Sequence, residues 1–259
     1  MSSFFAILKI LALAVWTLPL TTLQIILLVF YKGKGAYYIP RLWHKGVCAI
    51  TGLKTEIGGH PIHGKQVIYV SNHLSYLDVP VIGSYLLASF VAKLDVAGWP
   101  VMGALAKVQQ TAFISRNSSH AKKVAGALDT MLQEGKSLIL FPEGTSSAGT
   151  SLLPFKSSLF SLVIPKEESH MTPVPIQPFV LELISVNGTP PTPQSRDLYS
   201  WYGEMDFAPH IWEFLKNRGA TVRLTFLAPV TPTIGQDRKE LCRIVQDEIQ
   251  TGLPVSDAV

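Results

Sequence analysis

Along most of the chain, short runs of apolar residues alternate with segments in which apolar residues recur every three or four positions. Short apolar runs bounded by Gly, Pro or polar residues predict strands, and the longer spacing predicts amphipathic helices. We therefore expect strands at 66–71, 89–93, 111–115, 137–141, 173–183 and 221–228. We expect helices at 77–87, 98–108, 119–133, 155–163 and 237–250. This alternation predicts an α/β domain with a mostly parallel central sheet.

The amino-terminal segment differs, because its apolar residues form one long run. From Phe4 to Phe30 the only charged residue is Lys9, and the run exceeds the roughly 20 residues that a helix needs to cross a bilayer. Pro19 lies near the middle of the run, and proline disrupts the hydrogen-bond ladder of a helix. Two arrangements are therefore open: one kinked membrane span, or two short helices that enter one leaflet and return.

Basic residues interleaved with aromatic ones follow this run: Lys32, Lys34, Arg41 and Lys45. Such a belt, with its excess of Lys and Arg, is typical of the cytoplasmic side of a membrane. We expect residues 1–58 to anchor the protein in the inner, cytoplasmic membrane of a cell. Residues 59–259 are then a domain that faces the cytoplasm, and the stretch 185–219, rich in Pro and Gly, is an insertion in it.

The composition indicates which kind of partner the protein has, a membrane surface or a nucleic acid. Charged residues make up 15% of the chain and apolar residues 47%, whereas about 25% charged residues is usual in soluble domains. The net charge of +4 suits an anionic membrane surface, and the sequence has no Lys/Arg-rich run of the kind that binds nucleic acid. Cys48 and Cys242 form no Cys-x-x-Cys motif and no disulfide framework, which fits a reducing compartment.

The first candidate for chemistry is Asn72-His73-Leu74-Ser75-Tyr76-Leu77-Asp78, which follows the apolar run Val67–Val70. A histidine at a strand exit with a nearby carboxylate is a candidate general base with its orienting group. Positions i and i+5 of a helix lie about 140° apart, so the pair meets only if His73 sits in a turn and Asp78 begins the helix. The carboxylate would then hold one ring nitrogen as N–H and leave the other free to accept a proton. A buried histidine with an incidental neighbour is the alternative.

Polar side chains also follow two other predicted strands. Arg116 comes after the run 111–115, and its planar fork suits a phosphate or carboxylate, although a surface arginine fits the same pattern. Glu143 follows the strand 137–141 in the turn Phe141–Thr145. It can accept a hydrogen bond from a substrate hydroxyl, cap a helix or pair with Arg116. Carboxyl ends of parallel strands meet at one edge of a sheet, so we expect these groups to converge there.

Four segments, taken in order, resemble the motifs of the glycerolipid acyltransferase family, and of bacterial 1-acyl-sn-glycerol-3-phosphate acyltransferases in particular. They are Asn72-His73-x4-Asp78, Phe113-Ile114-x-Arg116, Phe141–Thr145 and the proline-containing Val174–Pro178. The match covers roughly residues 60–180. The resemblance implies that 59–259 is an acyltransferase domain, docked on the membrane by hydrophobic helices. It also implies a lysolipid acceptor and an acyl thioester of coenzyme A or acyl carrier protein as donor. We expect no cofactor or metal, since no His-Glu-x-x-His motif occurs and the histidines are scattered.

The resemblance also implies roles for individual residues. His73 is the expected base and Asp78 its orienter, while Arg116 and Glu143 position the head group and hydroxyl of the acceptor. Gly144 and Thr145 are expected to shape that pocket. Two further residues are expected to contact the substrate: Asn72, beside the base, and Lys156, which is available to an anionic group.

One position departs from the family pattern and bears on the acceptor. Many members that use a phosphate-bearing acceptor have arginine directly after Glu-Gly-Thr, whereas this chain has Ser146 and then Ser147. The related lyso-ornithine lipid acyltransferases are similar to this chain at this Ser-Ser pair and across Leu153–Phe160. Our first expectation is 1-acyl-sn-glycerol-3-phosphate as acceptor, giving phosphatidic acid, and lyso-ornithine lipid is the alternative. A non-catalytic lipid-binding protein on this fold, and a thioesterase, are weaker alternatives.

Overall fold

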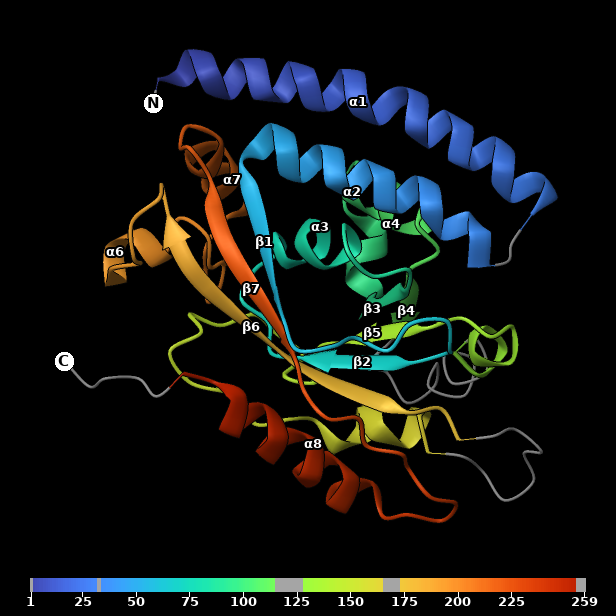
Figure 1. Cartoon of the computed structure of the whole chain (residues 1–259). Coiled ribbons are helices and arrows are strands. Elements are labelled where there is room, and N and C mark those ends of the chain that lie inside the picture. Colours follow the sequence, from blue (N-terminus) through green and yellow to red (C-terminus); the bar gives the residue numbers. More distant parts are fainter. Residues whose placement is uncertain (1, 32–33, 115–127, 165–172, 255–259) are drawn as a thin grey trace.

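The computed structural model describes residues 2–31, 34–114, 128–164 and 173–254 (Figure 1). Its strands are β1 (Leu53–Gly58), β2 (Ile68–Ser71), β3 (Ser89–Lys93), β4 (Ala112–Ile114), β5 (Leu138–Leu140), β6 (Ile176–Val186) and β7 (Ala220–Phe226). Within the described residues they form one seven-stranded sheet in the order β1-β7-β6-β2-β5-β3-β4. Neighbouring strands are parallel except for β6 and β7. The predicted α/β fold with a mostly parallel sheet is confirmed.

Each strand that the sequence predicts is present, and β1 is an additional one. β1 pairs in parallel with β7 at the edge of the sheet, where most of its residues are partly or fully exposed. The sheet therefore begins inside the segment 1–58. The proline-containing strand that starts near Val174 is central, because β6 lies between β7 and β2.

The helices are α1 (Ser3–Phe30), α2 (Tyr38–Thr51), α3 (Asp78–Gly83), α4 (Met102–Val108), α6 (Pro193–Arg196), α7 (Phe207–Leu215) and α8 (Arg238–Gly252). The predicted helix 155–163 is instead a 3-10 helix, Ser157–Leu162. The predicted helix 119–133 lies partly outside the described residues, and its part from 128 to 133 is helical. The predicted helices 77–87 and 98–108 are shorter in the structure, where α3 and α4 occupy them.

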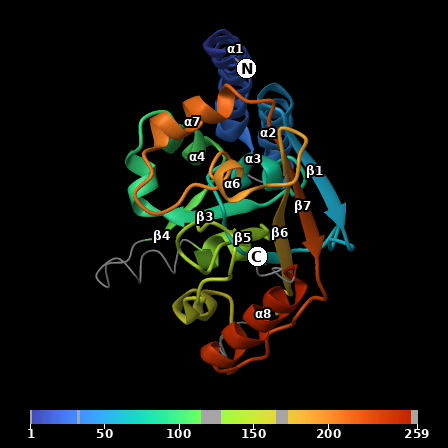
Figure 2. The ribbon, with the colours of Figure 1, turned by 90° about the vertical axis from the view of Figure 1, so that its left-hand side faces the viewer.

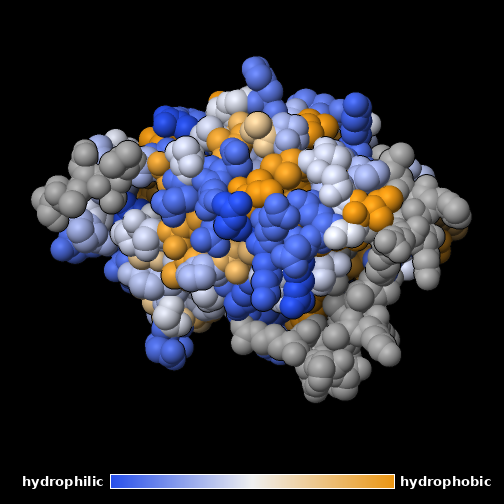
Figure 3. All heavy atoms as spheres, turned by 90° about the horizontal axis from the view of Figure 1, so that it is seen from below, coloured by the Kyte–Doolittle hydropathy of each residue, from blue (hydrophilic) through white to orange (hydrophobic). Residues whose placement is uncertain are grey.

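Helices cover the sheet on both faces, and α8 lies on the face opposite α1 and α2 (Figure 2). One buried cluster joins the sheet to α2, α3 and α7 through Cys48, Val81 and Phe214. A second cluster joins the other face of the sheet to α8, with Leu241 and Val245 fully buried. Seen from the α8 side, a broad hydrophilic area lies among smaller apolar patches (Figure 3). The side of the molecule away from α1 therefore exposes many polar side chains.

The long apolar helix α1 lies alongside α2 and continues through Pro19 without a break (Figure 1). Its polar side chains bind the body of the protein. The Lys9 ammonium group donates to the carbonyl oxygens of Thr51 and Asn217, at 3.0 and 2.7 Å. The Gln24 amide donates to the carbonyl oxygen of Ala36 at 2.9 Å. Large apolar side chains occupy the exposed face: Phe4, Phe5, Ile7, Leu8, Ile10, Leu11, Val15, Leu18, Leu23, Ile25, Ile26, Val29 and Phe30.

Candidate active site

His73 lies in the loop between β2 and α3, and Asp78 is the first residue of α3. This is the geometry that the spacing requires, and the two side chains meet. His73 Nδ1 is 2.7 Å from Asp78 Oδ2. A carboxylate oxygen can only accept at this contact, so Nδ1 carries the hydrogen and Nε2 is the basic nitrogen. The ring stacks on Phe141, with centroids 4.1 Å apart, and in the described part of the chain Nε2 has no hydrogen-bond partner.

The Asp78 carboxylate is fully buried and has four hydrogen-bond donors. Oδ2 accepts from His73 Nδ1 and from the backbone N–H groups of Leu74 and Ser75, at 2.7 and 3.1 Å. Oδ1 accepts from the hydroxyl of Tyr199 at 2.7 Å. A buried carboxylate is costly unless its oxygens are paired in this way. The loop backbone and Tyr199 together stabilise the charge that orients His73.

Glu143 joins the loop after β5 to the loop after β2. Its Oε1 accepts from the backbone N–H of His73 at 2.7 Å, and its Oε2 accepts from that of Leu153 at 3.0 Å. Burial raises the pKa of this carboxyl to about 7, against the opposing effect of the two backbone donors. Glu143 therefore fixes the backbone of His73, and the pKa of its carboxyl lies near neutral pH.

The turn after Glu143 supplies the wall of a cavity. Gly144 has φ of +66°, and the Lys156 side chain lies so close that a Cβ on Gly144 would come within 2.5 Å of Nζ. Thr145, Ser146, Ser147 and Tyr202 are among the residues that line an open cavity of about 410 Å³. None of the described residues that line it is charged. This cavity can take a polar group by hydroxyl and backbone hydrogen bonds.

Two predicted site residues remain to be placed, Asn72 and Arg116. Asn72 is buried, and its amide donates to the carbonyl of Leu181 at 2.9 Å and accepts from the Leu181 N–H at 2.8 Å. These contacts bind its polar group to β6, where it fixes the exit of β2. Arg116 lies outside the described residues. The structure thus brings His73 and Asp78 together with Glu143 at one edge of the sheet.

Sequence reasoning missed the contribution of the stretch 185–219. Tyr199 donates to Asp78, and the Trp201 N–H donates to the carbonyl oxygen of Leu74 at 2.9 Å. Ser146 is buried, and its hydroxyl donates to the carbonyl oxygen of Trp201. No residue spacing could signal a contact between positions 121 apart. The aromatic cluster at 199–202 was the available signal, but it did not specify a partner.

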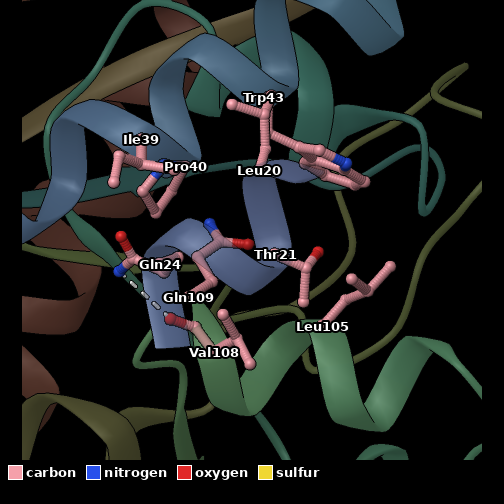
Figure 4. Close-up of a pocket in the computed structure, with 9 residues that line it drawn as sticks. All are labelled: Leu20, Thr21, Gln24, Ile39, Pro40, Trp43, Leu105, Val108 and Gln109. Atoms are coloured by element: carbon pink, nitrogen blue, oxygen red, sulfur yellow. Dashed lines mark hydrogen bonds between the residues drawn. The ribbon is translucent and has the colours of Figure 1, made fainter. Parts of the chain in front are cut away.

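A second cavity, of about 30 Å³, lies between α1, α2 and α4 and is distinct from the His73 loop. Figure 4 shows Leu20 and Gln24 of α1 facing Trp43 of α2 and Val108 of α4. A space of this size holds a water molecule or two, but no substrate. Across the described residues, no group of three or more His, Cys, Asp or Glu could hold a metal ion. The His73 loop is therefore the candidate active site.

Several known proteins are similar to this chain in sequence. The acyltransferase family model matches residues 54–182. The lyso-ornithine lipid O-acyltransferase of Brucella abortus is 31% identical over 227 residues, which cover 86% of this chain and 85% of that protein. The 1-acyl-sn-glycerol-3-phosphate acyltransferase of Neisseria meningitidis is 27% identical over 208 residues, covering 80% and 77%.

A crystal structure resembles the whole chain. It is that of the 1-acyl-sn-glycerophosphate acyltransferase of Thermotoga maritima, with a TM-score of 0.68, 17% identity and coverage of 99% of this chain and 96% of that one. At this identity the likeness concerns the fold alone. Together with the relatives of higher identity, it leads to one conclusion: this chain belongs to the lysolipid acyltransferase family that includes the 1-acyl-sn-glycerol-3-phosphate and the lyso-ornithine lipid acyltransferases.

Proposed function

We propose that this lysolipid acyltransferase moves a fatty acyl group from a thioester donor to the hydroxyl of lyso-ornithine lipid, with His73 as general base. The observation that supports His73 as the base is its Nδ1 contact with Asp78, which leaves Nε2 as the proton acceptor. The observation that favours this acceptor is Ser146, which stands where many phosphate-binding members have arginine.

The reaction needs one base and no enzyme nucleophile. His73 Nε2 takes the proton of the acceptor hydroxyl while the hydroxyl oxygen attacks the thioester carbonyl. The carbon–sulfur bond then breaks, and the acyl group stays on the acceptor oxygen. The thiolate of coenzyme A or acyl carrier protein leaves and takes the proton from His73, which restores the base. Asp78 stabilises the imidazolium that forms during attack. A positioned base of this kind contributes on the order of 10²–10⁴-fold to the rate.

The cavity beside Glu143 supports an acceptor without phosphate. The hydroxyl-bearing residues Thr145, Ser147 and Tyr202 line it, and its described lining has no charged side chain. A phosphate dianion is bound most strongly by the fork of an arginine. Ser146 cannot supply such a fork, and its hydroxyl is engaged by the carbonyl oxygen of Trp201. Four curated relatives that are 28% to 31% identical to this chain are also named lyso-ornithine lipid O-acyltransferases.

Lysophosphatidic acid is the second candidate acceptor, and Lys156 favours it. The Lys156 side chain is exposed and lies over Gly144 at the mouth of the site. Its ammonium group can contact an anionic head group there. We propose that Gly144 and Lys156 contact the head group of either acceptor, whereas Asn72 acts by holding the loop that carries His73.

We propose that α1 attaches the protein to the inner membrane along one leaflet, with the catalytic domain in the cytoplasm. α1 is long and apolar enough to cross a bilayer, but Lys9 and Gln24 bind its length to the body. A spanning helix would have to break these contacts. With α1 held against α2, its exposed apolar face is free to enter the lipid, and α8 faces away from it (Figure 2). The site then lies close to a lipid acceptor.

An acceptor panel tests this proposal. The purified full-length protein is given radiolabelled acyl thioester, on acyl carrier protein or on coenzyme A, with lyso-ornithine lipid, lysophosphatidic acid or no acceptor. We expect labelled ornithine lipid as the main product. Product from lysophosphatidic acid alone would overturn the acceptor. Release of free fatty acid without an acceptor would indicate a thioesterase, and binding without turnover a non-catalytic protein.

A further inference from the structure

Tyr199 contacts the carboxylate that orients the base. Its side chain is fully buried, and its hydroxyl lies 2.7 Å from Asp78 Oδ1, on the oxygen that His73 does not use. We propose that Tyr199 is a positioning residue, which sets the basicity of His73 by sharing the negative charge of Asp78. This inference rests on the proposed role of His73 as the base.

The segment around Tyr199 is fixed from two sides. The Trp201 N–H donates to the Leu74 carbonyl at 2.9 Å, which ties the segment to the His73 loop. The His210 Nε2 of α7 lies 3.0 Å from the carbonyl of Asp197 and 3.1 Å from that of Ser200. Carbonyl oxygens only accept, so Nε2 carries the hydrogen there. The Tyr199 hydroxyl is therefore held at Asp78 by its backbone as well as by its own hydrogen bond.

His210 also connects this segment to the base loop. Its Nδ1 lies 2.7 Å from the hydroxyl of Tyr76 and accepts from it, because Nε2 holds the ring hydrogen. Burial lowers the pKa of His210, which favours the neutral ring that this arrangement needs. The stretch 197–201 is thus packed between α7 and the loop that carries His73, and it has a place in the site that its sequence did not reveal.

Tyr199 acts as a donor and not as an acid or base. Burial, and then the charge of Asp78, raise the pKa of its phenol well above the ordinary value. Among the described residues, the other titratable groups whose charge bears on Tyr199 or Asp78 are Cys48, Tyr76, Glu143 and His73. Burial raises the pKa of Cys48 to about 12 and raises that of Tyr76, so both stay neutral.

The consequence concerns the pH at which His73 becomes a base. A donor on Oδ1 withdraws charge from the carboxylate and weakens its attraction for a protonated imidazole. Without that donor, either His73 or Asp78 keeps its proton to a higher pH. In either case, His73 can accept a proton from the acceptor hydroxyl only at a higher pH than in the wild-type protein. Glu143 titrates in the same range, with a pKa of about 7, so a readout at His73 itself is needed beside activity.

The test compares Tyr199→Phe with Tyr69→Phe in the full-length protein. Tyr69 is also buried, and its hydroxyl donates to the carbonyl of Ile62 at 2.9 Å, outside the site. We measure kcat and KM against pH. We also measure, without substrate, the rate at which diethyl pyrocarbonate modifies His73 at each pH, by mass spectrometry of its peptide.

In Tyr199→Phe we expect kcat to fall roughly tenfold, from the loss of a hydrogen bond to a charged group, with KM little changed. The pH at which kcat reaches half its maximum on the acid side should rise by about half a pH unit or more, and so should the pH midpoint of His73 modification. Tyr69→Phe should change neither. An unmoved midpoint, even with a uniform loss of kcat, would overturn the proposal.

One further variant and one property of the modification readout keep this test decisive. If Tyr199→Phe does not fold, 3-fluorotyrosine placed at position 199 alone keeps the ring and strengthens the donor. The midpoint should then fall, and a rise or no change would contradict the role of Tyr199. The modification rate needs no turnover, so it still reports the coupling of Tyr199 to His73 if His73 proves not to be the base. Failure of the proposed function is thereby distinguished from failure of this inference.

Discussion

At the scale of residues, the spacing of His73 and Asp78 set the condition under which the two side chains could meet. Five positions do not share a helix face, so the pair needed a turn followed by a helix start, and the structure has both. The partners of Asp78 on its other oxygen could not be predicted in this way. Tyr199 is distant along the chain, and its approach depends on how α7 and the stretch 197–201 pack.

Glu143 provides a prediction about stability and pH. Its pKa is about 7 in the folded protein, against 4.5 for an ordinary glutamate. The folded state therefore holds a proton that the unfolded chain has released, and stability falls as pH rises from 4.5 through 7. Glu143→Gln removes this dependence, so its stability relative to wild type should rise between pH 5 and 8.

The expected change is on the order of 3 kcal/mol, since each pKa unit corresponds to about 1.4 kcal/mol. Glutamine cannot accept from both His73 and Leu153, and this loss should lower stability equally at every pH. Urea unfolding at pH 5, 6, 7 and 8 measures the difference. A difference between the two proteins that does not vary with pH would show that Glu143 is not titrating in this range.

At the scale of elements, the hydrophobic pattern was sufficient to predict the buried strands, but it missed the exposed edge strand β1. β2 and β5 are fully buried, and their continuous apolar runs marked them clearly. β1 has one buried residue, Leu53, and charged residues at Lys54 and Glu56. Its pairing with β7 comes from the far end of the chain, so the local residues carry only a weak signal.

The exposed face of α1 provides a prediction about membrane attachment. Leu11, Val15 and Leu18 are 58%, 73% and 69% exposed and recur at helical spacing. Replacing all three by serine should weaken binding to vesicles by roughly three orders of magnitude, because each buried apolar side chain contributes about 1.5 kcal/mol or more. Sedimentation with anionic vesicles measures this. Serine at Arg243 and Glu248, which are exposed on α8, is the control and should leave binding unchanged.

At the scale of the whole molecule, the two faces differ in character. α1 presents a row of apolar side chains on one side. α8 lies on the opposite side of the sheet, and its exposed residues include Arg238, Lys239, Glu240, Arg243, Asp247 and Glu248 (Figures 2 and 3). The apolar composition of residues 1–58 could be read from the sequence. The position of α1 against the body could not be predicted in this way, because it depends on the tertiary contacts of Lys9 and Gln24.

The position of the two ends of α1 distinguishes attachment to one leaflet from a span. Phe4 and Phe30 are both exposed, and the native Cys48 and Cys242 are buried. Phe4→Cys and Phe30→Cys can therefore each carry a nitrobenzoxadiazole label on the protein bound to preformed vesicles. Dithionite added outside should reduce both labels. Protection of one end until the vesicles are opened by detergent would indicate that α1 spans the bilayer.

The most direct test of the catalytic role of His73 is the turnover of His73→Ala with the lysolipid that the wild-type protein accepts best. His60→Ala is the matched control, because His60 is an exposed histidine outside the site. We expect a loss of about 10³-fold in kcat for His73→Ala, with circular dichroism and vesicle binding unchanged, and full activity for His60→Ala. Turnover by His73→Ala within about tenfold of wild type would contradict the assignment of His73 as the base.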